Sequence, residues 1–102
     1  LEKLERIEIS GTSLQILSGS GVNLKRVTLR NALSMKKLNL HNFQNIEQVL
    51  IVEDSNQPDH IECIAVPASK VDAIKNGINM TGNNGPAKTT AYRSKVQSTP
   101  CN

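Results

Sequence analysis

Aromatic residues are almost absent from this sequence. It has no Trp, one Phe and one Tyr among 102 residues, whereas hydrophobic residues make up 37% of the chain. A core with so few rings must be built from Leu, Ile and Val, which suits layers of many similar side chains. The length fits one small domain with a modest core.

Long apolar runs and strong charge are absent too. No stretch approaches the roughly 20 apolar residues that span a bilayer, and no charged-then-apolar secretory segment opens the chain. The chain starts at Leu1, inside what reads as a repeat, so we expect a portion of a longer protein from which a signal peptide could have been removed. The net charge of +3, with no aromatic residues among the basic ones, argues against a nucleic-acid partner.

Motifs for metal binding are missing. His41 and His60 are isolated, and both fall at expected corners of the chain. Asp59 and His60 with Glu62 and Cys63 would be a conceivable metal site, but no paired His or Cys spacing supports it. A solvated loop before a strand is the favoured interpretation of this segment.

Motifs for catalysis are missing as well. Gly19 and Gly21 lack the third glycine and the following helix of a phosphate-binding loop. Ser18 and Ser20 lack the context of a nucleophile elbow. We therefore expect no enzymatic activity, no metal and no cofactor.

A short pattern, apolar-x-x-apolar-x-apolar, does recur. Its copies are Leu4, Ile7, Ile9; Leu24, Val27, Leu29; Ile46, Val49, Ile51; and Ile61, Ile64, Val66. The first three copies are 20 and 22 positions apart, and a further copy at Met35, Leu38 and Leu40 begins 11 positions from each neighbour. The last two apolar positions of each copy lie two apart, which places them on one face of a short strand.

This spacing predicts a leucine-rich-repeat solenoid of the α/β class, mostly β, with short parallel strands stacked in about three coils. The half-period copies, with a weaker one around Leu14, Ile16 and Leu17, imply two strands per coil. Gly11, the segment 18–21 and the segment 42–45 are expected at the corners. An antiparallel β-sandwich is the alternative, but it explains neither the constant spacing nor the recurring triplet.

The segment after the last copy predicts a cap. Pro67 ends the strand, Ser69 is the expected N-cap of a short helix, and Gly77 is its expected stop. Val71 and Ile74 would face the exposed end of the core. We therefore divide the chain into repeat coils at 1–66 and a C-terminal cap and tail at 67–102.

The phrase V-P-A-S-K-V-D-A within residues 63–75, followed by Tyr92-Arg93-Ser94-Lys95-Val96, resembles the closing region of BspA-like leucine-rich-repeat proteins of Bacteroidales. The resemblance implies a secreted or cell-surface protein of the bacterial envelope that acts in adhesion. The chain departs from the pattern in having Ile74 where Tyr is usual, only Phe43 near an aromatic corner, and an insertion at 81–90.

The two cysteines leave two alternatives open. Cys63 occupies a variable position of its triplet, so its side chain is expected to point outward, and Cys101 is next to the last residue. A disulfide would tether the tail to the last strand with a stabilisation on the order of 4 kcal/mol. Two free thiols are the other possibility.

The outward positions of the strands are the expected binding surface. Stacking the copies gives one ladder of Arg6, Arg26, Gln48 and Cys63 and a second of Glu8, Thr28, Leu50 and Ala65. Flanking positions alternate in sign at Glu5, Lys25, Glu47 and Glu62, and a basic spot on the half-coil side consists of Lys36 and Lys37.

The candidate partner-binding face is therefore Arg6, Glu8, Arg26, Thr28, Gln48 and Leu50. The expected partner is a host or cell-surface protein; a solvated sheet face is the plainer alternative for any single residue. A structural or accessory subunit of a larger envelope assembly, one that handles glycans for example, is the second functional hypothesis. Missing N-terminal repeats or another chain are expected to cover the first coil.

Overall fold

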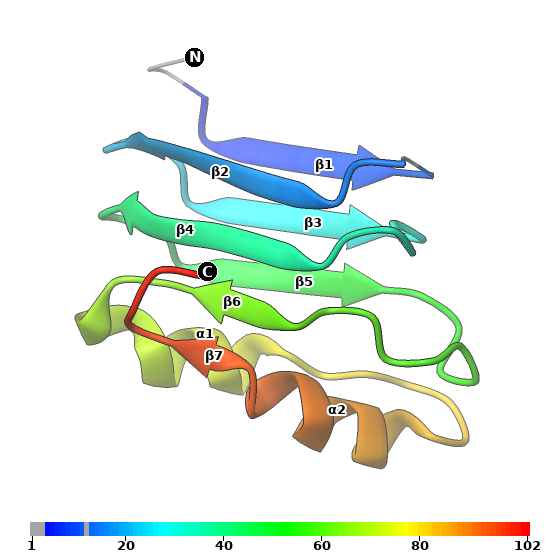
Figure 1. Cartoon of the computed structure of the whole chain (residues 1–102). Coiled ribbons are helices and arrows are strands. Elements are labelled where there is room, and N and C mark those ends of the chain that lie inside the picture. The colour runs from blue at the N-terminus through cyan, green and yellow to red at the C-terminus, as the bar shows by residue number, and fades with distance from the viewer. Residues whose placement is uncertain (1–3, 12) are drawn as a thin grey trace.

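Short strands, of which β1 to β6 alternate between two sheets, form the framework of this chain (Figure 1). The computed structural model describes residues 4–11 and 13–102; Leu1 to Lys3, the first residues of the predicted repeat region, and Thr12 lie outside the described residues. The strands are β1 (Arg6–Ser10), β2 (Ile16–Gly21), β3 (Arg26–Arg30), β4 (Lys37–Phe43), β5 (Gln48–Val52), β6 (Cys63–Ala65) and β7 (Val96–Gln97). A 3-10 turn η1 (Ala68–Lys70) and the helices α1 (Val71–Gly77) and α2 (Gly85–Arg93) complete the described part.

All strand pairs in the two sheets are parallel. One sheet has the order β1-β3-β5, and the other has the order β2-β4-β6-β7. Val27 pairs with Val49 and Leu29 with Ile51, so the predicted side-by-side parallel arrangement of residues 24–29 and 46–51 is confirmed. The interleaved copy also occupies the second sheet as expected, since Leu38 of β4 pairs with Leu17 of β2.

The core lies between the two sheets. Val27, Leu29 and Val49 enter it from one sheet, and Leu38 and Leu40 enter it from the other. Because successive side chains of a strand point to opposite faces, the polar residues between these positions face outward. The repeated aliphatic positions from Leu24 onward therefore form one continuous layer, whereas Leu4, the first position of the first copy, is exposed.

The prediction that the fourth copy of the pattern continues the ladders of the first three is wrong. Cys63 pairs with Lys37 of β4, and Ala65 pairs with Asn39, so neither continues the ladders that end at Gln48 and Leu50. Glu62 likewise donates its backbone N–H to the Lys36 carbonyl at 2.7 Å and does not flank Glu47. The physical reason is length: Ile46 and Ile61 are 15 positions apart, which is less than one full period and brings the chain only to the opposite side.

One predicted corner lies wholly in a strand, and another lies partly in one. The segment 18–21 lies in β2; Asn42 and Phe43 lie in β4 with His41, whereas residues 44 and 45 form a turn as predicted. A Cβ added to Gly19 would lie 2.9 Å from the Phe43 ring, and the register of β2 against β4 shifts between Ser18 and Ser20. Glycine at this position permits an aromatic ring to pack closely at a β-bulge. In the sequence alone, the same glycines indicate a turn.

The C-terminal segment both packs against the repeat region and extends the second sheet. α1 packs against β5, its Ile74 is buried, and the helix ends at Gly77 as predicted. Ser69 is not the N-cap: it lies within η1, Lys70 precedes α1, and no side chain caps the helix, because the chain is already coiled after Pro67. α2 was not predicted, and β7 pairs with β6, so residues 67–102 add a strand to the second sheet.

No helix within residues 4–11 and 13–102 combines the length and apolar character that crossing a membrane requires.

Candidate functional site

The outer surface of the β1-β3-β5 sheet, here called the ladder face, brings together the candidate binding residues. Arg6, Arg26 and Gln48 are direct partners across the three strands. Glu8, Thr28 and Leu50 form the next rung in the same register. Since neighbouring strands lie about 4.8 Å apart, the side chains within each rung are held at a fixed spacing.

The charges on the ladder face are only partly matched. Lys25 lies 3.8 Å from Glu5, and Arg30 lies 3.5 Å from Glu8. Arg6 and Arg26 make no ion pair or side-chain hydrogen bond with any described residue. The face therefore carries two guanidinium groups that its own carboxylates leave unused.

A shallow hollow lies where the strands of this sheet begin. It has a volume of about 210 Å³ and is lined by Glu5, Arg6, Lys25, Arg26 and Glu47. The lining is charged throughout, so the hollow suits an ionic side chain of a partner better than an apolar one.

The predicted basic spot on the other sheet is not an open binding feature. Lys37 of β4 donates from its Nζ to the backbone carbonyl of Asn102. The tail thus binds the side chain of one of the two lysines, and the ladder face remains the stronger candidate for binding a partner.

A polar cluster whose centre is buried, and which sequence reasoning missed, joins the cap to the repeat region. Glu53 follows β5, Asp59 and His60 precede β6, and Lys88 and Tyr92 belong to α2; these five residues are called the Glu53 cluster. The side chains of Glu53 and Lys88 are each only 2% exposed, and Tyr92 is fully buried.

Both carboxylate oxygens of Glu53 have partners in this cluster. One carboxylate oxygen lies 2.7 Å from Nε2 of His60, and the other accepts from Lys88 Nζ and from the Tyr92 hydroxyl, both at 3.0 Å. Lys88 also donates to Asp59 at 3.0 Å and to the Gln57 carbonyl at 2.8 Å. Buried charges persist when they are paired in this way, so the cluster fastens α2 to the loop after β5.

The interpretation of residues 59–63 as a solvated loop is wrong for His60. Its side chain is 14% exposed, and Nδ1 lies 2.6 Å from the Met35 carbonyl oxygen. The partners that bury it come from positions 35, 53 and 92, and Tyr92 contacts it edge-on. No local motif connects these positions, so a single sequence offers no signal for them.

The cluster shifts two pKa values upward. Burial, followed by the negative charge of Glu53, raises the pKa of Tyr92 from 10.0 to about 12. Burial alone would lower the pKa of Lys88, but its hydrogen bonds to Asp59 and Glu53 outweigh this and hold that pKa above its ordinary value. Both groups therefore keep their protons in the folded protein at a pH where the unfolded chain releases them.

We expect the contribution of this cluster to the free energy of unfolding to be fully present below about pH 10. It should be lost between about pH 10 and pH 12, because the folded state binds more protons than the unfolded state in that range. Tyr92 is the single tyrosine and there is no tryptophan, so phenolate absorbance reports this residue alone. A spectrophotometric titration should give a midpoint near pH 12 in buffer and near pH 10 in concentrated urea. Equal midpoints in the two solvents would contradict the buried position of Tyr92.

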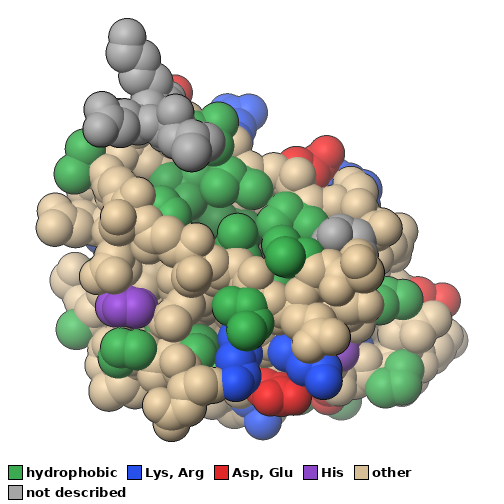
Figure 2. All heavy atoms as spheres, turned by 45° about the horizontal axis from the view of Figure 1, so that its top comes forward, with side chains coloured by type: hydrophobic (Ala, Val, Ile, Leu, Met, Phe, Trp, Pro, Cys, Tyr) green, Lys and Arg blue, Asp and Glu red, His purple; other side chains and the backbone are tan. Residues whose placement is uncertain are grey.

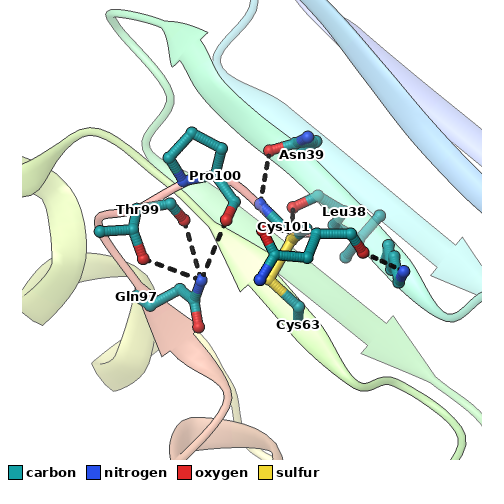
Figure 3. The surroundings of a disulfide bond; sticks show 9 residues. Leu38, Asn39, Cys63, Gln97, Thr99, Pro100 and Cys101 are labelled. Atoms are coloured by element: carbon teal, nitrogen blue, oxygen red, sulfur yellow. Dashed lines mark hydrogen bonds between the residues drawn. A yellow bond between two sulfur atoms is a disulfide. The ribbon is translucent and has the colours of Figure 1, made fainter.

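The tail is attached by a disulfide between Cys63 and Cys101, the paired one of the two alternatives (Figure 3). Cys63 has the strand register of Lys37, so it points away from the core as predicted, but the tail covers it. Cys101 also donates its backbone N–H to Oδ1 of Asn39 at 3.1 Å. The side-chain amide of Gln97 donates to the Thr99 carbonyl at 2.9 Å and holds the turn before the disulfide.

Within residues 4–11 and 13–102, no three His, Cys, Asp or Glu side chains are grouped so that they could hold a metal ion. Comparison of the chain with models of protein families, with curated protein sequences and with solved structures gives no match. The site is therefore defined by its geometry: an ordered, charged ladder face on one sheet and a cap fixed to the other end of the core.

Proposed function

We propose that this chain is a leucine-rich-repeat solenoid that acts as a non-catalytic binding module and recognises a protein through its ladder face. The observation that carries the proposal is the register of β1, β3 and β5, which aligns Arg6 with Arg26 and Thr28 with Leu50. Stacked repeats use such surfaces for recognition because rigid strands hold side chains at fixed intervals.

The cysteines support the proposed compartment. Disulfides form and persist mainly in secreted, periplasmic and surface proteins, and are rare in the reducing cytosol. The Cys63–Cys101 bond thus supports a secreted or cell-surface location, and the resemblance to BspA-like proteins suggests the bacterial envelope. The resemblance to BspA-like proteins suggests adhesion to a host or cell-surface protein as the role of the ladder face.

We expect replacement of Arg26 and Leu50 by alanine to lower affinity for the partner at least about tenfold, which corresponds to about 1.4 kcal/mol. An array of purified host extracellular proteins would identify the partner, and biolayer interferometry would measure both proteins. The matched control replaces Lys95 and the exposed Leu33, which lie outside the ladder face, with alanine. Equal affinities of the two double variants would contradict the proposal.

One observation favours the alternative of a structural subunit. Large apolar side chains are exposed around the outer edges of β1 and β2, at Leu4, Leu14, Ile16 and Val22. Figure 2 shows apolar side chains gathered toward this end of the molecule. Exposed apolar surface beside sheet edges is typical of assembly contacts. Stable co-purification with envelope proteins, together with no binding on the array, would favour this role.

A further inference from the structure

We infer that Arg6 and Arg26 together bind a carboxylate side chain of the partner, and this inference rests on the proposed function of the ladder face. The two residues are direct neighbours on parallel strands, and both are exposed. Their Cα positions are separated by one strand spacing, about 4.8 Å. Two guanidinium groups therefore project side by side from the same rung.

This arrangement opposes the stability of the sheet. Like charges directly across neighbouring strands repel each other, and each such pair is destabilising. Elsewhere on the same face the cations have carboxylates nearby, as Lys25 has Glu5 and Arg30 has Glu8. Arg6 and Arg26 are thus the exception on this surface, because Lys25 and Arg30 each lie close to a carboxylate.

The chemistry of guanidinium groups indicates the ligand. Each is a planar fork of N–H donors that fits the two oxygens of a carboxylate, and an ionised carboxylate can accept about four hydrogen bonds. A Glu or Asp side chain placed between the two forks would use these acceptor positions and relieve the repulsion between Arg6 and Arg26. The hollow of about 210 Å³ is lined by both arginines together with Lys25, Glu5 and Glu47, so three cations face two carboxylates and the excess charge there is positive.

The next rung specifies a second feature of the partner. Leu50 lies on the outer face one strand and two residues away from Arg26. From the midpoint of Arg6 and Arg26, one and a half strand spacings combined with two residues of rise give a separation of about 10 Å. In an extended peptide, side chains two residues apart lie on one face at about 7 Å. The long arginine side chains bridge the difference of about 3 Å, so the face suits an extended segment with an acidic residue two positions from an aliphatic one.

The test uses an isotope-labelled sample of the whole chain and the peptide ESLSESL, with QSLSQSL as the uncharged control. We expect the acidic peptide to shift the amide NMR signals of residues 6, 26 and 50, and to bind at least about tenfold more tightly than the control peptide. Arg6→Gln with Arg26→Gln should abolish this difference. Lys70→Gln with Lys95→Gln removes the same charge from the cap and should preserve it.

Thermal unfolding separates binding from structural roles. If the two arginines serve recognition, Arg26→Gln should leave the midpoint unchanged or raise it, because the repulsion with Arg6 is removed. A lower midpoint, or equal binding of the two peptides, would overturn the inference. So would binding of a sulfated oligosaccharide with no binding of the acidic peptide.

Failure of the inference and failure of the proposed function have different signatures. If the array partner loses affinity with Leu50→Asp but not with Arg6→Gln and Arg26→Gln, the ladder face binds a protein without using this carboxylate site. If neither change affects the partner, the ladder face is not the binding surface.

Discussion

Replacing Glu53 with glutamine should lower the free energy of unfolding by about 3 to 5 kcal/mol, the range found when one member of a buried ion pair is removed. Glutamine keeps the shape but loses the charge that Lys88 and His60 face at 3.0 and 2.7 Å. Lys88 would then retain only Asp59, whose side chain is 47% exposed, as a charged partner. Urea denaturation followed by circular dichroism would measure the change.

The matched control is Glu47→Gln. Glu47 is an exposed glutamate beside β5 and makes no ion pair with any residue in the described part. Its replacement should change stability by no more than about 0.5 kcal/mol, as for most surface positions. A change of under 1 kcal/mol in Glu53→Gln would contradict the role assigned to the Glu53 cluster.

A double replacement tests whether the loss comes from an unpaired charge. Glu53→Met with Lys88→Met removes both charges of the central pair and fills the space with apolar atoms. Apolar replacement of a complete buried pair is often neutral, so the double variant should be more stable than Glu53→Gln alone. The single variants Glu53→Met and Lys88→Met complete the comparison. A loss in the double variant equal to the sum of the two single losses would mean that the two residues are not coupled.

The repeat region was predictable because its signal is local and recurs. Leu24, Val27 and Leu29 have the same spacing as Ile46, Val49 and Ile51, and stacking in register is the simplest way to bury both sets. The same reasoning placed the outward residues Arg26 and Leu50 correctly. It failed at Ile61, where the chain reaches the opposite sheet before a full period is complete.

The Glu53 cluster was not predictable because its contacts are long-range. Glu53 and Lys88 are 35 positions apart, and Lys88 lies in the segment 81–90, which the sequence indicates only as an insertion relative to the BspA-like pattern. Its helix has Gly85 and Pro86 in the first turn and two threonines, so local propensity gives little indication of α2. Tertiary contacts of Lys88 and Tyr92 hold this helix in place. These contacts form only in the folded chain, so the local sequence does not indicate them.

Removing the Cys63–Cys101 disulfide should lower the free energy of unfolding by roughly 4 kcal/mol, because the bond closes a loop with a sequence separation of 38 and so restricts the unfolded chain. The comparison is urea denaturation of the native protein with and without reductant. The variant Cys63→Ser with Cys101→Ser is the control, and reductant should not alter its midpoint. Mass spectrometry should show the native protein gaining the mass of two hydrogen atoms on reduction.

The closed loop contains η1, both helices and β7, so the disulfide and the Glu53 cluster hold the same segment by different means. The disulfide acts mainly on the unfolded chain, whereas the cluster acts through contacts in the folded state. Reduction should therefore leave the cluster intact, and Tyr92 should keep its high titration midpoint in the reduced protein. A midpoint that falls to near pH 10 on reduction would mean that α2 is held by the tail and not by Glu53.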